Sequence, residues 1–334
     1  MTTGIRALPS GLRTRPLTAA DAEAINEIMA EAERAEPAEQ HFDLAEVDEM
    51  LADPNLDLPR ASLGLLDEDR LVGWGWIDRA PVNTEWKAFL MGGIRPDHAR
   101  RGLGRYLVEA LAAQAEALRA EQAPQLPGRL KLWLPEGRHG AAALSDAAGF
   151  STLRYFFEMR RDLAADPPVQ TPVPAGYRLV GWQPELSDAV RLAHNEAFAD
   201  HWDSEPLSAE RWRVAVTDSA NFRPETCRVA LTDEGGIGGY VITEEFPAEA
   251  KAFGFRVGYI ALVGTVRAAR GHGIASALMS SCLVGLAGAG YRRAELTVDA
   301  DSPTGAGRIY TRLGFGQVKR NRTTGRALSA PAAV

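Results

Sequence analysis

The chain repeats one domain-sized pattern. Residues 12–33 and residues 177–198 each read as a short strand, a polar turn that contains an Asp, and an amphipathic helix. Arg13 and Arg178, each the second residue of its segment, lie 165 positions apart. A repeat of this length requires a fold that can be built twice from one chain.

Two further landmarks recur in the same order. The Gly-Phe pairs that begin at Gly149 and Gly314 are also 165 positions apart, and the glycine turns at Gly102 and Gly273 are 171 positions apart. Chance is a poor explanation for three ordered landmarks at nearly one offset. We therefore interpret the chain as a tandem duplication of one domain.

A proline-rich stretch separates the two copies. The segment AADPPVQTPVPAG contains four prolines and continues neither a helix nor a central strand, so we expect an extended linker there. The expected organisation is an N-terminal domain over residues 1–163, a linker over 164–175 and a C-terminal domain over 176–334. The length of 334 residues agrees with about two domains.

Each copy combines strands and helices in one order. Apolar runs joined by turn residues predict hairpins over residues 61–78 and 227–246. A further strand is expected near residues 89–96 and near residues 258–267, followed each time by a glycine turn and a helix. Each copy is therefore predicted to be an α/β domain with a mixed central sheet flanked by helices.

Composition limits the possible functions. Hydrophobic residues make up 46% of the chain and charged residues 24%, which is ordinary for a globular protein with a core. The net charge of −7 gives no electrostatic case for a nucleic-acid partner. We expect no membrane span and no signal peptide. The two cysteines, Cys227 and Cys282, are too far apart for a metal motif and exclude a disulfide framework, which fits a cytoplasmic protein.

The turn RGHGIASAL, residues 270–278, is suited to hold an anion. A helix N-terminus has unpaired N–H groups and partial positive charge, and glycines let the backbone approach a ligand without a Cβ. These features suit a phosphate or pyrophosphate, and Arg270 can add a charged contact. A tight strand-to-helix connection without a ligand is the alternative. The chain lacks a P-loop motif, and Gly271, Gly273 and Ser276 miss the dinucleotide fingerprint.

The pattern Arg-x-x-Gly-x-Ala, formed by Arg270, Gly273 and Ala275, resembles the acyl-CoA pyrophosphate loop of the GNAT superfamily of N-acetyltransferases. The flanking segments are similar to that family in the same order, including a tyrosine four residues before a Gly-Phe pair. The resemblance spans residues 176–320, and a degenerate copy covers 10–163. The tandem layout is similar to that of the mycothiol synthase group within the family.

This resemblance implies transfer of an acetyl group from acetyl-CoA, as cosubstrate, to an amine without a metal. Such a reaction needs the thioester beside a neutral amine, N–H donors where the oxyanion develops, and groups that move protons. By carry-over, Tyr310 protonates the leaving thiolate, although its spacing also suits an aromatic packed on a helix face. A strand end would contact the acetyl carbonyl and pantetheine arm, and the glycine loop would hold the pyrophosphate. The expected cofactor-binding residues are Leu262, Val263, Gly264, Thr265, Val266, Arg270, Gly271, His272, Gly273, Ile274, Ala275, Ser276 and Ser302.

The general base is not identified by the resemblance. Many relatives place a glutamate on the strand before the loop, where this chain has Tyr259. Glu244 and Glu245, at the end of the neighbouring strand, are catalytic candidates that would act through a water. They fit solvated charges at a strand end as well. Asp299 is a further candidate and fits a cap equally.

The acceptor is expected opposite the cofactor, beside the helical region around residues 194–212. His201 and Trp202 are the foremost candidates to line it, and burial in the core is the alternative for the aromatic residues of this region. The candidates are His194, Phe198, His201, Trp202 and Trp212.

The first copy departs from the pattern at two positions. Ala99 stands where the loop has its leading arginine, and Ser145 takes the tyrosine position before Gly149. We therefore expect this copy to be catalytically silent. The preferred function is acetylation of a small-molecule amine in the C-terminal domain by a monomer or homodimer. The alternatives are a non-catalytic acyl-CoA sensor and a protein N-acetyltransferase.

Overall fold

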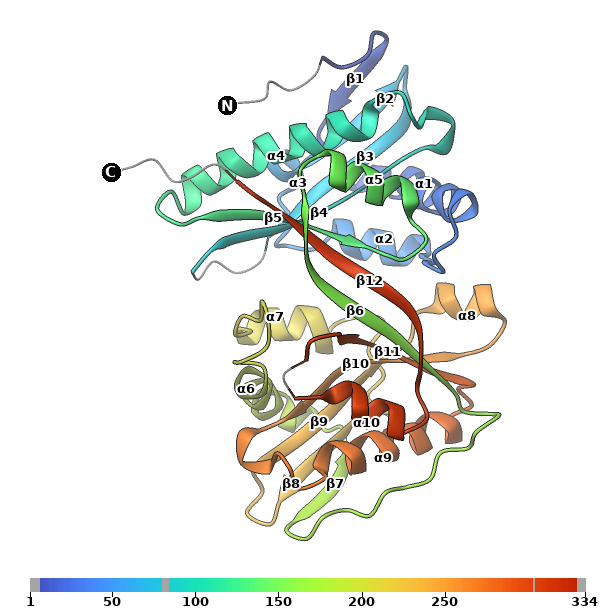
Figure 1. Cartoon of the computed structure of the whole chain (residues 1–334), viewed down its shortest axis with the longest axis vertical. Coiled ribbons are helices and arrows are strands. Elements are labelled where there is room, and N and C mark those ends of the chain that lie inside the picture. The colour runs from blue at the N-terminus through green and yellow to red at the C-terminus, as the bar shows by residue number, and fades with distance from the viewer. Residues whose placement is uncertain (1–6, 80–83, 303, 329–334) are drawn as a thin grey trace. The chain divides into compact units, whose positions relative to one another are not determined.

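A computed structural model of the chain describes residues 7–79, 84–302 and 304–328. Its residues form two compact units (Figure 1). Unit 1 comprises residues 1–155 and 321–334, and unit 2 comprises residues 156–320. Strands and helices alternate in both units, and each sheet contains parallel and antiparallel pairs, so the predicted α/β fold class is confirmed.

Unit 1 has the strand order β1-β2-β3-β4-β5, followed by the end of β12. The β4–β5 pair is parallel and its neighbours are antiparallel. Its strands are β1 (Leu12–Arg15), β2 (Ser62–Asp67), β3 (Arg70–Arg79), β4 (Trp86–Ile94), β5 (Gly128–Leu134) and the start of β6 (Ser151–Asp162). Its helices are η1 (Ala19–Asp21), α1 (Ala22–Ala35), α2 (Leu44–Leu51), α3 (Leu58–Ala61), η2 (Pro96–His98), α4 (Leu103–Gln122) and α5 (His139–Ala147).

Unit 2 has the strand order β6-β11-β10-β9-β8-β7. The β10–β11 pair is parallel and its neighbours are antiparallel. Its strands are β7 (Tyr177–Gly181), β8 (Arg228–Thr232), β9 (Ile237–Glu244), β10 (Val257–Thr265), β11 (Arg293–Asp299) and the start of β12 (Gly316–Ala327). Its helices are η3 (Pro184–Leu186), α6 (Ser187–Ala197), α7 (Ala209–Trp212), η4 (Arg213–Thr217), α8 (Pro247–Phe253), η5 (Arg267–Ala269), α9 (Ile274–Gly288) and α10 (Ala306–Arg312).

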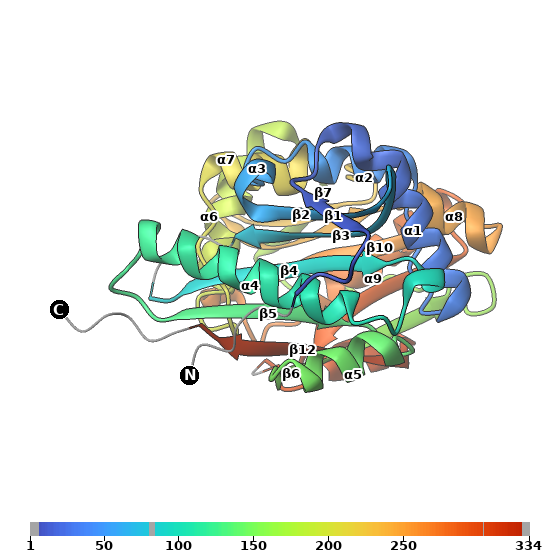
Figure 2. The same cartoon turned by 90° about the horizontal axis from the view of Figure 1, so that it is seen from above.

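Each sheet is covered on both faces because its strands alternate their side chains between two apolar layers. In unit 1, α4 lies along β4 and β5 (Figure 2), and α1 covers the opposite face. In unit 2, neighbouring residues of β9 show the same division. Gly239 lies under Leu278 of α9, whereas the Tyr240 hydroxyl is 2.6 Å from His194 Nδ1 of α6. We refer to these two surfaces as the α9 face and the α6 face.

The last strand of each copy joins the sheet of the other unit. β6 follows the first Gly-Phe pair, and its residues 156–162 pair antiparallel with β11 of unit 2. β12 follows the second pair, and its residues 322–327 pair antiparallel with β5 of unit 1. Each sheet therefore obtains its sixth strand from the copy that does not supply the rest of it.

The compact units consequently differ in their bounds from the predicted domains, which describe the sequence repeat and stay a prediction. The predicted linker, residues 164–175, contains no helix or strand. It runs along α9, since the Thr171 N–H donates to Ser280 Oγ at 2.9 Å. Pro174 lies close to Gly273. Among the described helices, none combines the length and apolar character needed to span a bilayer.

Candidate functional site

Strands β10 and β11 form a fork in unit 2. They pair only where Val257–Tyr259 meet Arg293–Glu295, yet β10 continues to Thr265 and β11 to Asp299. The other edge of β10 stays paired with β9, with a one-residue bulge at Ala261. Beyond Tyr259, the inner edge of β10 offers backbone donors and acceptors that the β10–β11 ladder does not use.

The predicted glycine loop leads from β10 into α9. Gly271 and Gly273 have φ angles of 79° and 85°, the left-handed region that glycine occupies without strain. Gly273 is the N-cap, and α9 begins at Ile274. The N–H groups of the first helical turn have no partners within the helix, so they face the end of the loop with partial positive charge. This geometry suits an anion.

Arg270 fastens this loop to α6. Its Nη2 donates to the Ala197 carbonyl at 2.9 Å, and its Nε donates to the Thr265 carbonyl at 3.3 Å. The backbone N–H of Arg267 donates to Glu196 Oε1 at 2.9 Å. The side chain of Arg270 is one-third exposed. The structure thus shows Arg270 holding the loop, and its contact with a pyrophosphate stays a prediction.

Tyr310 is buried on α10. Its ring packs against Phe315, with the ring centroids 6.2 Å apart, and 8% of the residue is exposed. Burial raises the pKa of the phenol to about 12, so it keeps its proton at neutral pH. A thiol has a pKa near 8.5, well below the value of about 12 for this phenol, so a free thiolate is too weak a base to take the proton readily. The phenol can therefore supply its proton only while the C–S bond breaks.

Glu245 belongs to a buried ion cluster. Its carboxylate accepts hydrogen bonds from Arg223 Nε at 3.0 Å, Arg256 Nε at 2.7 Å and the Tyr291 hydroxyl at 2.9 Å. The bond from Arg256 is the main reason why its pKa falls to about 2. A carboxylate with so low a pKa is a weak base, and its donors already occupy it, so this geometry favours a structural role.

Glu244 faces Tyr259 across the β9–β10 ladder. Every second side chain of a strand points to the same face of the sheet. Tyr240 points to α6, so Glu244, four residues further along β9, and its register partner Tyr259 also lie on the α6 face. Burial raises the pKa of Tyr259 to about 12. Of the two predicted glutamates, Glu244 is the one whose strand position lies beside the fork and whose carboxylate is outside the ion cluster of Glu245.

The acceptor-side candidates fall into two groups. His194 and Trp212 are core residues, 6% and 2% exposed, and burial lowers the pKa of His194 to about 4. His201 and Trp202 lie in the segment between α6 and α7 that we call the acceptor loop, residues 198–207. Phe198 stacks on His194 at the start of this loop, with centroids 4.5 Å apart.

Asn195 closes the base of the acceptor loop. Its Oδ1 accepts from the Leu207 N–H at 2.8 Å, and its Nδ2 donates to the Leu207 carbonyl at 3.0 Å. Asp200 of this loop binds Arg267 of the glycine loop, with Oδ2 and Nη2 2.6 Å apart. Phe156, which sequence reasoning missed, packs 6.2 Å from Trp202. No local signal marks Phe156, because its place depends on the pairing of β6 with β11.

Ser302 lies in the turn between β11 and α10. Its N–H donates to the Asp299 carbonyl at 3.1 Å, and its carbonyl accepts from the Gly305 N–H at 3.1 Å. The hydroxyl lies 3.1 Å from Thr304 Oγ1. Asp299 Oδ1 accepts from the Asp301 N–H, as expected for a turn cap. The predicted contact of Ser302 with the cofactor stays a prediction.

Unit 1 keeps the turn and has a serine at the tyrosine position. Gly102, with a φ of 83°, caps α4 as Gly273 caps α9, but Arg100 adopts the left-handed conformation that Gly271 takes in unit 2. Ser145 is fully buried, and its Oγ lies 2.9 Å from Thr324 Oγ1 of β12. The tyrosine position of the first copy therefore serves a buried structural hydrogen bond.

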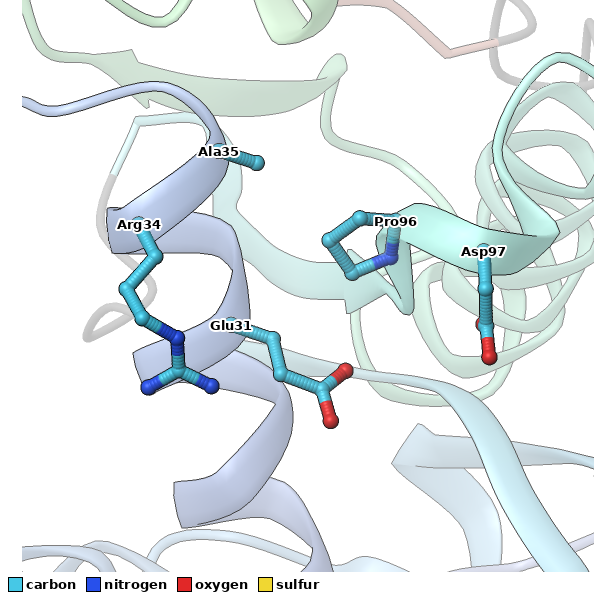
Figure 3. Close-up of a pocket in the computed structure, with 5 residues that line it drawn as sticks. All are labelled: Glu31, Arg34, Ala35, Pro96 and Asp97. Carbon is cyan, nitrogen blue, oxygen red and sulfur yellow. The ribbon is translucent and has the colours of Figure 1, made fainter.

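A hollow of about 370 Å³ in unit 1 lies between α1 and η2 (Figure 3). Its walls come from the end of α1 and from the residues that follow β4, and the sticks of Glu31, Arg34 and Asp97 line it. Glu31 binds Arg95, and Asp97 binds His98. The carboxylates that line the hollow therefore hold the loop that follows β4 to its neighbours. In the described parts of the chain, no three His, Cys, Asp or Glu side chains gather as a metal site would require.

Comparisons with known proteins find the same family in both copies of the repeat. The model of the acetyltransferase (GNAT) family matches residues 23–130 and 187–315, once in each copy. Mycothiol acetyltransferase from Streptomyces scabiei is 29% identical over 94% of this chain and 96% of its own length. Mycothiol acetyltransferase from Salinispora arenicola is 28% identical over 91% of each protein.

Solved structures share the fold. A GCN5-related N-acetyltransferase from Sphaerobacter thermophilus has a TM-score of 0.74 at 24% identity and covers 98% of this chain and 99% of its own. A tandem GNAT protein from the clavulanic acid biosynthesis pathway has a TM-score of 0.64 at 20% identity and covers 95% of this chain and 99% of its own. With one family match in each copy, the chain belongs to the GNAT family of N-acetyltransferases and consists of two GNAT domains in tandem.

Proposed function

We propose that the chain transfers an acetyl group from acetyl-CoA to a primary amine of a small molecule, and that the reaction takes place at the fork of unit 2. The main support for this proposal is that three features occur together in unit 2: the bulged fork, the glycine loop with two left-handed glycines, and Tyr310. Unit 1 has a loop of the same kind but a buried serine at the tyrosine position.

The fork and loop fit the acyl donor. Within Leu262–Thr265, the backbone groups that β9 and Arg270 do not use can bind a carbonyl and an amide-containing arm, as backbone groups bind a strand. The N–H groups at the start of α9 suit the pyrophosphate, since Gly271 and Gly273 bring no side chain between backbone and ligand. Backbone donors held by the β9–β10 ladder need no reorganisation when charge develops on the thioester oxygen.

In this reaction the amine nitrogen attacks the thioester carbonyl carbon, and the C–S bond then breaks. Tyr310 gives its proton to the sulfur that leaves, and the amine nitrogen loses a proton. Glu244 is the candidate that takes this proton through a water. Tyr259 stands where many members of the family have a glutamate, so proton removal here differs from the pattern in those members.

A small-molecule acceptor is supported by the curated relatives, whose names identify them as mycothiol acetyltransferases. The acceptor of this chain is a separate question, because Tyr259 departs from the family pattern on the acceptor side. A protein amine is the competing acceptor, and binding of acetyl-CoA without turnover would return the protein to a sensor role.

Calorimetric titration of acetyl-CoA into matched variants tests the proposal. Gly273→Glu and Gly102→Glu place the same charge at equivalent N-caps with φ angles of 85° and 83°, and neither position is crowded. We expect binding to be lost in Gly273→Glu and retained in Gly102→Glu. Loss in Gly102→Glu alone would move the site to unit 1, and no binding to the wild type would refute the proposal. Acetyl transfer to a peptide but to no small amine would identify a protein acceptor.

A further inference from the structure

The acceptor loop and β6 place two aromatic side chains at the mouth of the fork. Phe156 pairs with Asp299, the last residue of β11, so it lies across β11 from the open end of the fork. Trp202 lies in the acceptor loop, and the two ring centroids are 6.2 Å apart with an angle of 54° between the rings. Phe156 thus packs beside the acceptor loop, which lies next to the fork and the glycine loop.

Strand alternation places Phe156 on the side of the sheet opposite the cofactor helix. Its neighbours Phe157 and Met159 join the apolar layer under α9, so Phe156 and Glu158 face the other way. That is the α6 face, on which Tyr259 and Glu244 also lie. A group that reaches the fork from the α6 face would therefore lie on the same side of the sheet as the Phe156 ring.

The pair differs from the core aromatics of the same unit. Trp212 is 2% exposed and Tyr240 is fully buried, whereas Phe156 and Trp202 are both half-buried. Two aromatic rings at an inclined angle and partly open to water leave ring surface for a further apolar partner. The acceptor loop that holds Trp202 is closed at its base by the two hydrogen bonds between Asn195 and Leu207.

The acceptor loop is also connected to the cofactor side. Asp200, two residues before Trp202, binds Arg267 of the glycine loop, and Arg270 binds the last carbonyl of α6. The acceptor loop and the glycine loop are therefore linked by an ion pair and a hydrogen bond. An acceptor held against Trp202 has a defined relation to the acyl donor.

Resting on the proposed function, we propose that Phe156 and Trp202 select the acceptor, and that this acceptor is a primary amine with a flat or apolar ring face close to its amino group. An aryl ring and a pyranose both present such a face. Phe156 belongs to the first copy of the repeat, so the acceptor specificity of unit 2 depends on a residue outside the second copy. Neither ring takes part in proton transfer.

The experiment compares acceptors and variants with acetyl-CoA as donor. Phenethylamine carries an aryl ring, glucosamine carries a pyranose, and n-butylamine carries neither. The variants are Phe156→Leu, Trp202→Leu and the control Phe222→Leu, because Phe222 is another partly buried phenylalanine paired with a tryptophan of unit 2, Trp182. Calorimetry with acetyl-CoA measures whether each variant keeps its donor site.

We expect at least one ring-bearing amine to exceed n-butylamine about tenfold in kcat/KM, a size typical of one aromatic contact. Phe156→Leu should lose this preference through a higher KM for the ring-bearing amine, with acetyl-CoA affinity unchanged. Phe222→Leu should keep the preference. Which of the two ring-bearing amines is preferred distinguishes an aryl acceptor from a sugar.

Results of three kinds would overturn the inference, and they can be told apart. Equal kcat/KM for all amines in the wild type, or a preference that survives in Phe156→Leu, would refute the selection while leaving acetyl transfer in place. Binding of acetyl-CoA without acetylation of any of these amines would refute the ring-amine acceptor. Failure of the wild type to bind acetyl-CoA would refute the proposed function together with this inference. If Trp202→Leu does not fold, Phe156→Leu alone decides.

Discussion

The two GNAT domains share a turn and differ in the strand that precedes it. β4 of unit 1 pairs with β3 in one unbroken register from Ala88 to Ile94, whereas β10 of unit 2 shifts register at Ala261. Both strands fork from their parallel neighbours, and both turns end in a left-handed glycine N-cap. The bulge therefore distinguishes the strand of the domain proposed to be catalytic, in addition to Gly271 in the turn and Tyr310 on α10.

The tyrosine position shows how unit 1 keeps its fold. Ser145 replaces a ring by a small hydroxyl, and Thr324 of β12 satisfies that hydroxyl in the buried layer. Tyr310 instead fills its layer with a ring that packs on Phe315. The comparison teaches that a GNAT domain can have a small hydroxyl in place of the tyrosine ring when a buried hydrogen bond satisfies that hydroxyl.

The largest expected effect concerns Tyr310 of unit 2, compared with Ser145 at the same position of unit 1. Tyr310→Phe should lower kcat by about 10²- to 10³-fold, because it removes the proposed general acid and little packing. Since burial raises the pKa of Tyr310 to about 12, the wild-type phenol stays protonated, and kcat should show no loss of this acid up to about pH 10. Steady-state kinetics over pH 6–10 measures both.

Ser145→Ala is the matched variant in unit 1. It should leave kcat unchanged and lower the free energy of unfolding by about 1–2 kcal/mol, since it leaves Thr324 with a lost partner in the core. Full activity in Tyr310→Phe, or a large loss of kcat in Ser145→Ala, would reverse the assignment of the two domains.

The next effect compares two glycines at equivalent places. A Cβ on Gly264 of β10 would overlap the buried ring of Tyr240, while a Cβ on Gly93 of β4 would come within 3.1 Å of Trp74 Nε1. Gly264→Ala should lower the free energy of unfolding by about 3 kcal/mol and Gly93→Ala by about 1 kcal/mol. The reason is that the Tyr240 ring has less room than the Trp74 ring to move away from the added Cβ.

Denaturant unfolding measures this pair, and acetyl-CoA affinity gives a second readout. Gly264→Ala should also weaken acetyl-CoA binding, as it displaces the strand that lines the fork. Equal stability losses in the two variants would mean that Tyr240 does not constrain β10 more tightly than Trp74 constrains β4.

A third effect tests whether the Glu245 cluster is structural. Glu245→Gln should lower the free energy of unfolding by about 2 kcal/mol at pH 7, reduced from the value for a fully buried pair because Arg256 is 42% exposed. The native pKa is lowered to about 2, so the stabilisation is full above the unfolded value near 4.5 and is lost as the pH falls toward 2.

Denaturant unfolding between pH 2 and pH 7 measures the Glu245 effect. The difference between wild type and Glu245→Gln should shrink over this range as the pH falls. A variant with unchanged stability and a large loss of kcat would instead identify Glu245 as a catalytic group, against the geometry of its three donors.

The smallest effect concerns the left-handed residue of each turn. Gly271→Ala should lower the free energy of unfolding by about 1 kcal/mol, because its φ of 79° penalises a Cβ. Arg100→Gly in unit 1 should raise it by a few tenths of a kcal/mol (~0.5), as relief of strain outweighs the greater freedom of the unfolded glycine. Thermal unfolding of both variants measures the difference; changes of the same sign in the two variants would show that the two turns are not equivalent.

The sequence alone determined the features that depend on neighbouring residues. The two hairpins, the glycine turns and the helices that follow them were predicted near their observed places, because turn residues and apolar periodicity act over a few positions. The left-handed φ angles of Gly102 and Gly273 follow from the same local preference. The repeat itself was visible as a constant offset between such local signals.

Only the tertiary structure decided which strand completes each sheet. β6 and β12 have similar places in the repeat, and nothing in their own residues states that residues 156–162 pair with β11 or that residues 322–327 pair with β5. Strand pairing of this kind is a long-range choice, made by the edge that remains open after the rest of the sheet has formed. Phe156 reaches Trp202 only through that choice.

Long-range packing also decided the roles of the charged residues. Glu244 and Glu245 are adjacent in sequence, yet Glu245 meets Arg223, Arg256 and Tyr291, which lie up to 46 positions away. Arg270 matched a loop pattern, and the fold adds its bond to Ala197, 73 positions away. A side chain's pKa and partners depend on what the fold brings near it, and one-dimensional spacing does not contain that information.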